Sequence, residues 1–377
     1  MPESNDRGHS AETSSLAAPG KVKIDICRRL GDGWPELADY VQIPSHERRQ
    51  FRQGFEAQAI WEWLDSRSRL RELPEALRYI GRSDLAVLWV ETQRQSAGRY
   101  YRDCIERWSS PRYALDKRFV QLTLLLDQGE ETQGPRWHGS ERFEELTQVL
   151  DRVPHQALVL LGPPGAGKST LLRHFAMDQA RAVLNGPSET ELVDAPLSFW
   201  ISLNDYKARR PGDPLPLPED WLTERWQTAN PALPSLFTLL REQRLTLLLD
   251  ALNEMPHSGD EPIRLWKDFL QMLGRDYPHN RVIFSCRSLD YSASLSSKEW
   301  PVPQVRIEPL SDAQVQRFVE LFTVPSMPTR SGPIWTVRRS LNFCAHRITS
   351  KCWSTRPSQA KFRLAAPHCS PALCARR

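Results

Sequence analysis

One segment of this 377-residue chain, ALVLLGPPGAGKST at residues 157–170, restricts it to a small group of folds. The apolar run ALVLL predicts a buried strand, and the segment LLRHFAMDQA that follows predicts a helix. Between them the sequence fits the pattern G-x-x-x-x-G-K-[ST]. Glycines in such a turn let backbone N–H groups surround phosphate groups, and the positive end of a helix dipole comes next. The segment therefore predicts a phosphate-binding loop between a strand and a helix.

The side chains of this loop have distinct expected roles. Lys168 is expected to reach the β- and γ-phosphates of a nucleotide, and Ser169 to coordinate Mg²⁺. A glycine-rich turn with a purely structural role is the alternative, and the complete match to the pattern disfavours it. The residues expected to bind the nucleotide phosphates are Gly162, Pro163, Pro164, Gly165, Ala166, Gly167, Lys168, Ser169 and Thr170.

A second apolar run, within RLTLLLDALNEM at residues 244–255, ends in an acidic residue. Magnesium at a phosphate loop needs a further protein ligand opposite the phosphates, and a carboxylate oxygen suits it. We expect Asp250 to hold Mg²⁺, directly or through water, and Glu254 to polarise an attacking water molecule. The alternative is a strand that ends in a solvated Asp-Asn turn.

A third apolar strand, VIFSC at residues 282–286, is followed by Arg287. Ligands of open α/β sheets bind at the carboxyl edge of the strands. A cation at that edge, on the strand beside the acidic one, is suited to sense a γ-phosphate. An ordinary exposed arginine at the end of a strand is the alternative.

The chain divides by pattern into several regions. Apolar runs alternate with helical stretches over residues 113–323, which predicts an α/β domain with a parallel sheet. Residues 21–92 contain short segments with apolar residues at helical spacing, which predicts an all-α bundle of six helices. We expect a disordered leader at residues 1–20, a linker at residues 93–112 and an irregular or disordered tail at residues 324–377.

Charge is distributed unevenly along the chain. Residues 1–112 carry 18 basic and 17 acidic side chains, residues 113–323 carry 22 and 29, and residues 324–377 carry 10 and 0. The overall net charge of +4 therefore combines a central region at −7 with a tail at +10. A basic tail of this kind is typical of nucleic-acid or membrane binding. The tail nevertheless mixes aromatic, proline and cysteine residues without helical or alternating periodicity.

A change of reading frame is our hypothesis for the tail. A back-translation of residues 341–356 with permitted codons, read two bases later, can give an amphipathic helical continuation. We therefore expect the frame to change between about residues 323 and 341, so that the chain is truncated or frameshifted there. The competing hypothesis is a genuine basic tail that binds nucleic acid in a salt-sensitive way.

Cysteines and apolar runs exclude other classes of protein. No CxxC pair and no Cys/His spacing suited to zinc occurs, and the pattern favours a reduced, cytoplasmic protein. The N-terminus has no apolar stretch, and no apolar run approaches the roughly 18 residues of a membrane helix.

The order of the motifs resembles a known family. GPPGAGKST, LLLDALNEM, VIFSCRS and IEPLSDAQVQRFVELF occur in the order found in the NACHT-type P-loop module of the signal-transduction ATPases with numerous domains. The resemblance covers about residues 113–323. It implies a regulated switch that binds ATP (or GTP) with Mg²⁺ and forms a homo-oligomer on activation. NACHT proteins more often have two acidic residues where Asn253 and Glu254 stand.

The N-terminal region resembles the death-like effector-associated domains that precede such ATPases in bacteria. The resemblance rests on GWPELADYVQIP and on the helices that end in PEALRYIGRSDL. It implies a partner effector protein with a matching death-like domain, in bacterial defence or cell-death signalling. A helical cap with a merely structural role is the alternative.

Two other functions stay open. The Asn253 position leaves a nucleotide-binding scaffold without significant hydrolysis as an alternative. An AAA-type ATPase that depends on nucleic acid is another, and the charge of −7 in the central region makes nucleic acid an unlikely partner.

Overall fold

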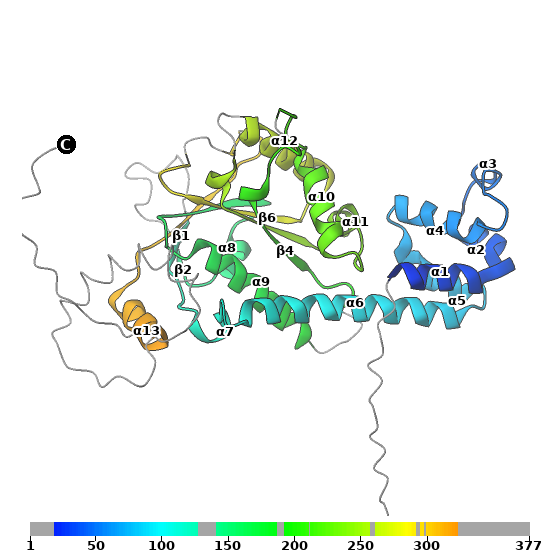
Figure 1. Ribbon diagram of the computed structural model, residues 1–377, viewed down its shortest axis with the longest axis horizontal. Coiled ribbons are helices and arrows are strands. Elements are labelled where there is room, and N and C mark those ends of the chain that lie inside the picture. Colours follow the sequence, from blue (N-terminus) through cyan, green and yellow to red (C-terminus); the bar gives the residue numbers. More distant parts are fainter. Residues whose placement is uncertain are drawn as a thin grey trace, which may run out of the picture. The chain divides into compact units, whose positions relative to one another are not determined.

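The computed structural model contains a helical N-terminal region and an α/β region (Figure 1). The expected basic tail and residues 1–18 of the expected leader lie outside the described residues. Pro19 and Gly20, which we expected in the leader, already belong to the first helix. The described residues are 19–126, 141–186, 192–210, 212–256, 261–291, 295–297 and 299–322.

The N-terminal helices pack around one apolar cluster. Its buried side chains include Ile26, Leu37, Ile60, Leu64 and Leu77, each at most 2 % exposed. The predicted helical region is confirmed, and its last helix continues far beyond residue 92. The elements are α1 (Pro19–Leu30), η1 (Gly31–Gly33), α2 (Trp34–Tyr40), α3 (Ser45–Arg48), α4 (Glu56–Ser66), η2 (Leu70–Glu72), α5 (Leu73–Tyr79) and the start of α6 (Ser83–Ser109).

Helix α6 occupies most of the segment that we expected to be a linker, residues 93–112. Its first turns contribute Trp89 to the N-terminal cluster, and later turns contribute Tyr101 to the core of the α/β region. The Tyr101 hydroxyl donates to the backbone oxygens of Ala195 (3.2 Å) and Pro196 (3.1 Å). Ala97, Tyr101, Cys104 and Trp108 do recur at helical spacing, a signal that the arginines and serines of this segment obscured in the sequence.

The sheet of the α/β region is mostly parallel, with an antiparallel edge that the sequence analysis did not predict. The strands lie in the order β2-β1-β7-β3-β6-β5-β4. Neighbours from β7 to β4 run parallel, whereas β1 pairs antiparallel with both β2 and β7. The strands are β1 (Leu124–Leu126), β2 (Glu141–Phe143), β3 (Ala157–Gly162), β4 (Leu197–Ser202), β5 (Leu245–Asp250), β6 (Arg281–Arg287) and β7 (Gln304–Ile307).

Both faces of the central strands are buried, which explains their continuous apolar sequences. In β3, Val159 and Leu161 belong to one core cluster, and Leu158 and Leu160 belong to another. Helices α10, α11 and α12 cover the first face, and α8 and α9 cover the second (Figure 1). The helices and turns of this region are α7 (Leu115–Arg118), α8 (Leu146–Arg152), α9 (Lys168–Leu184), η3 (Leu203–Asp205), α10 (Pro218–Ala229), α11 (Leu236–Arg241), η4 (Leu252–Glu254), α12 (Glu261–Asp276) and α13 (Asp312–Phe322). None of the helices described is long and apolar enough to cross a membrane.

Trp266 of α12 lies at the centre of the first cluster and is 0 % exposed. Replacing it with alanine should lower the free energy of unfolding by about 3–5 kcal/mol, because the space left behind cannot collapse fully. Its ring contacts four others edge-on, including that of Phe284 at 5.7 Å, and its Nε1–H has no hydrogen-bond partner. Trp266→Phe should therefore lower the free energy of unfolding much less, since it keeps an aromatic ring in the core and removes an unpaired donor.

Urea unfolding followed by circular dichroism measures both changes. Leu289→Ala is the control, because Leu289 is 96 % exposed and should change stability by at most about 0.5 kcal/mol. Equal stability of the Ala and Phe variants would contradict this account of the core.

Candidate functional site

The predicted phosphate loop connects β3 to α9. Gly165 and Gly167 have φ angles of 79° and 92°, a left-handed conformation that favours glycine. A Cβ atom at Gly162 would lie 3.1 Å from the Cβ of Ala166, so the loop leaves little room there for a side chain. The motif glycines are thus explained by the backbone path of the loop.

Lys168 begins α9 and turns back over this loop. Its Nζ donates to the backbone oxygens of Gly162 (2.8 Å) and Pro163 (3.0 Å). Burial lowers the pKa of the Lys168 ammonium, and the charge of Asp250 acts in the opposite direction. The two carbonyl oxygens hold the ammonium against the backbone that is expected to surround the phosphates.

Asp250 ends β5 and is 4 % exposed. Its Oδ1 accepts hydrogen bonds from the hydroxyl of Ser169 (2.9 Å) and from that of Ser285 (2.5 Å). Ser285 also accepts from the backbone N–H of Ala251 (2.9 Å), where the chain turns out of the strand with a φ of 64°. The buried carboxylate is therefore held by the first turn of α9 and by β6.

The side chains of Ser169 and Asp250 fit Mg²⁺, because both offer the hard oxygen atoms that this ion prefers. Within the described part of the chain, no group of three or more His, Cys, Asp or Glu side chains could hold a metal ion by itself. A magnesium ion here would complete its coordination with phosphate oxygens and water, as is usual when the ion enters with a nucleotide. The donor set thus suits a magnesium–nucleotide complex rather than a dedicated metal site.

Glu254 and Arg287 form an ion pair at the same edge of the sheet. Arg287 ends β6, where it lies opposite Gly162 in the pairing with β3. Its Nη2 donates to Oε1 of Glu254 at 2.7 Å, and the two side chains are 42 % and 43 % exposed. Exposed ion pairs of this kind contribute about 0–1 kcal/mol, so this one can open at little cost.

Asn253 joins the turn η4 to the end of β6. Its Oδ1 accepts from the backbone N–H of Arg287 (3.2 Å), and its Nδ2 donates to Oδ2 of Asp290 (3.1 Å). An amide can both accept and donate, whereas a carboxylate at this position would face the carboxylate of Asp290. An asparagine rather than an acidic residue at position 253 therefore suits the neighbouring Asp290.

All the residues expected at the site lie together, because the phosphate loop, Asp250, Glu254 and Arg287 meet at the carboxyl ends of β3, β5 and β6. Two further residues that contact Asp250, Ser285 and Arg173, were not predicted from the sequence. A serine within the apolar run of β6 was a signal for the first. The second lies four residues after Ser169, on the same face of α9, with its Nη2 4.0 Å from Oδ2 of Asp250.

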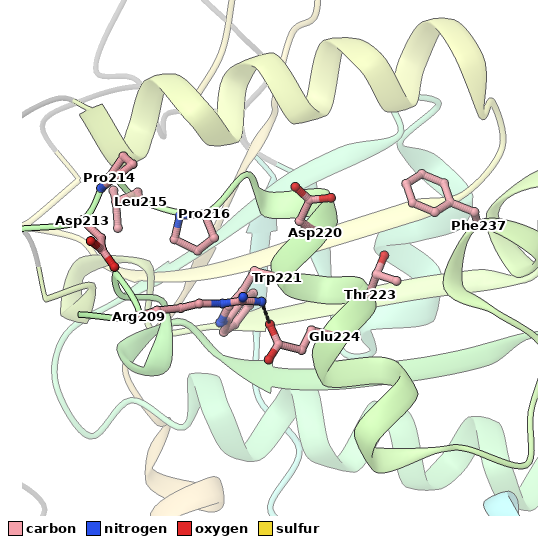
Figure 2. A pocket seen from close by; sticks show the side chains of 10 residues that line it. All are labelled: Arg209, Asp213, Pro214, Leu215, Pro216, Asp220, Trp221, Thr223, Glu224 and Phe237. Atoms are coloured by element: carbon pink, nitrogen blue, oxygen red, sulfur yellow. Dashed lines mark hydrogen bonds and ion pairs between the residues drawn. The ribbon is translucent and has the colours of Figure 1, made fainter.

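A separate open hollow lies beside α10 (Figure 2). An ion pair of 2.7 Å between Arg209 and Glu224 crosses it, beside Trp221 and Pro216. None of the phosphate-loop residues lines this hollow. The candidate site is therefore located by its motif residues and their contacts.

A strand, a glycine loop and a helix that carries Lys168, with a serine–aspartate pair beside them, define the class of a P-loop NTPase. Family models then identify two particular domains within the chain. Residues 156–323 match the NACHT domain, and residues 20–92 match Bacterial Death-like domain 3. The chain thus contains a nucleotide-binding NACHT domain and an N-terminal death-like domain, which confirms the resemblance seen in the sequence. A search of curated proteins found no match to the chain.

Ser285 offers a test of how the carboxylate is held. Ser285→Ala removes one donor to Asp250 and leaves the N–H of Ala251 without its acceptor. We expect the free energy of unfolding to fall by about 1–3 kcal/mol, the cost of an unsatisfied buried polar group. Urea unfolding measures it, with the exposed Ser66→Ala as the matched control. An unchanged midpoint for Ser285→Ala would show that the bridge contributes nothing.

Proposed function

We propose that this protein is a signalling switch whose NACHT domain binds ATP (or GTP) with Mg²⁺ and hydrolyses it slowly. Nucleotide state would control oligomerisation and the recruitment of an effector with a matching death-like domain, in bacterial defence or cell-death signalling. A reducing, cytoplasmic location is part of the proposal, since the three cysteines of the described residues, Cys27, Cys104 and Cys286, are free thiols.

The contact between Ser169 and Asp250 is the observation that carries the nucleotide-binding part of the proposal. According to this proposal, Lys168 and the backbone N–H groups of the loop bind the β- and γ-phosphates. Thr170, at the start of α9, belongs to the same phosphate-binding segment. Magnesium, when bound, would neutralise charge on the phosphates. A lone pair of the Ser169 hydroxyl oxygen would bind the ion while its proton still points to Asp250, and Ser285 would keep the carboxylate in place.

The ion pair between Glu254 and Arg287 supports a role in hydrolysis and in sensing. Hydrogen bonds to charged groups contribute about 1.5–3 kcal/mol, more than an exposed ion pair does. A γ-phosphate near Gly162 would therefore draw Arg287 from Glu254. The carboxylate of Glu254 would then be free to accept a proton from an attacking water.

The continuity of α6 supports the signalling part of the proposal. This helix contributes Leu85 and Trp89 to the death-like domain and Ala97 and Tyr101 to the core of the α/β region. A helix common to both cores is suited to carry a change of nucleotide state between them. The death-like domain also exposes apolar side chains, including Tyr79 (77 % exposed), which are available for contacts with a partner.

Lys168→Ala should weaken the binding of ATP by about tenfold or more, because the positive charge that pairs with the phosphates is lost. The apo protein should not be destabilised, since burial already disfavours the charged form of this lysine. Fluorescence anisotropy of a labelled ATP analogue measures the affinity, and thermal unfolding without nucleotide measures stability. The exposed Lys207→Ala is the matched control. Unchanged affinity in Lys168→Ala would remove the loop from the site.

Glu254→Gln should leave ATP affinity unchanged and slow hydrolysis by about 10²–10⁴-fold, because the amide cannot act as a base. Single-turnover hydrolysis measures the rate, with Glu224→Gln, on the separate hollow, as the control. An undiminished rate would remove Glu254 from catalysis. A wild-type rate as low as that of the variant would favour the scaffold without hydrolysis, and stimulation by DNA or RNA would favour the nucleic-acid-dependent ATPase.

A further inference from the structure

Arg173 of α9 lies next to Asp250, and three aromatic rings surround its guanidinium group. Its guanidinium carbon is 5.3 Å from the ring centroid of Trp108, 5.1 Å from that of Tyr113 and 4.7 Å from that of Trp200. We call these three side chains the aromatic cage. They come from the last turn of α6, from the segment that follows it and from β4, respectively. The cage thus joins three distant parts of the chain around one cation.

The rings of the cage also contact one another. Trp108 lies edge-on to Tyr113 and to Trp200, with centroids 5.0 Å and 5.4 Å apart. Cation–π attraction is strongest where water is excluded, and the Arg173 side chain is only 21 % exposed. Its pKa is lowered by burial, but an arginine stays protonated in proteins. The cage therefore holds a permanent positive charge.

This charge faces the expected magnesium ligand. Nη2 of Arg173 lies 4.0 Å from Oδ2 of Asp250, whereas Oδ1 accepts from Ser169 and Ser285. The two carboxylate oxygens thus have separate partners. If Ser169 also binds Mg²⁺, Ser285 at Oδ1 and Arg173 at Oδ2 still hold the carboxylate of Asp250.

Arg173 also has an unused donor. Its Nε is buried without a hydrogen-bond partner, and so is Nε1 of Trp200. Buried unpaired donors are costly, so a guanidinium in this position needs a reason beyond packing. Its orientation is determined by the rings on one side and by Asp250 on the other.

We propose that Arg173 is a positioning residue of the magnesium site, and that the aromatic cage makes the position of Asp250 depend on the end of α6. The inference rests on the proposed nucleotide-binding function and adds a residue to it. Because the coupling is a free energy, it is reciprocal: the end of α6 affects magnesium binding, and magnesium binding affects the end of α6. Asp250 contacts Arg173, which contacts Trp108 of α6. Since α6 also contributes to the core of the death-like domain, these contacts would couple the metal site to that domain.

The test measures nucleotide binding rather than turnover. Anisotropy of a labelled ATP analogue is followed first in EDTA and then with increasing MgCl₂, on the full chain. Arg173→Met should raise the half-maximal Mg²⁺ concentration by about threefold to tenfold, because Asp250 loses its second partner. Affinity in EDTA should stay unchanged, since the described contacts of the Arg173 side chain are with Asp250 and the aromatic cage. Trp108→Leu should show the same shift, and Trp108→Phe, which keeps a ring, a smaller one.

Tyr101→Phe is the matched control on the same helix. It removes hydrogen bonds of α6 without touching the cage, so it should lower the melting temperature but leave the Mg²⁺ dependence unchanged. If Arg173→Met does not fold, Arg173→Lys and Tyr113→Leu give the same comparison.

Three outcomes would overturn the proposal: an unchanged Mg²⁺ dependence, a lower half-maximal Mg²⁺ concentration, or an equal loss of affinity with and without Mg²⁺. The second would mean that Arg173 merely repels the ion. Absence of Mg²⁺-dependent binding in the wild-type protein would instead refute the proposed function, so the two failures are distinguishable.

Discussion

The hydrogen bonds to the buried carboxylate of Asp250 are the interaction on which the rest of the site depends. A carboxylate that is 4 % exposed is stable only if its oxygens are satisfied. Ser169 and Ser285 supply the donors, and they come from α9 and β6. The arrangement fixes the phosphate loop, the acidic strand and the strand between them in one geometry. Because the Ser169 hydroxyl can donate to Asp250 and still offer a lone pair to an ion, metal binding need not leave the carboxylate without donors.

The order of the strands explains why one edge of the sheet carries every expected group. Strand β6 lies between β3 and β5, so its last residues touch both the phosphate loop and the acidic strand. Ser285 therefore reaches Asp250, and two residues later Arg287 lies opposite Gly162. The two-residue spacing places both side chains on the same side of the strand. The structural role of β6, and the sensing role that we propose for Arg287, thus follow from its position in the sheet.

The sequence predicted those parts of the protein that depend on local patterns. The phosphate loop, the apolar strands and the helical N-terminal region are encoded by short motifs and periodicity, which need no knowledge of distant contacts. Ser285 and the aromatic cage were missed because their partners come from β5, α6 and β4, which only the folded chain brings together. The antiparallel β1 escaped notice because three leucines are too short a run to show its direction.

The helical character of residues 93–109 changes how the proposed switch could work physically. A flexible linker would let the death-like domain move independently of the nucleotide site, and nucleotide state could act only through effective concentration. A continuous helix instead transmits a rotation or shift at one end to the other, provided that both ends are anchored. Leu85 and Trp89 anchor one end, and Tyr101 and Trp108 anchor the other. Because Trp108 packs on the cation that faces Asp250, this anchored end is the part of α6 that the proposed magnesium site would affect most directly.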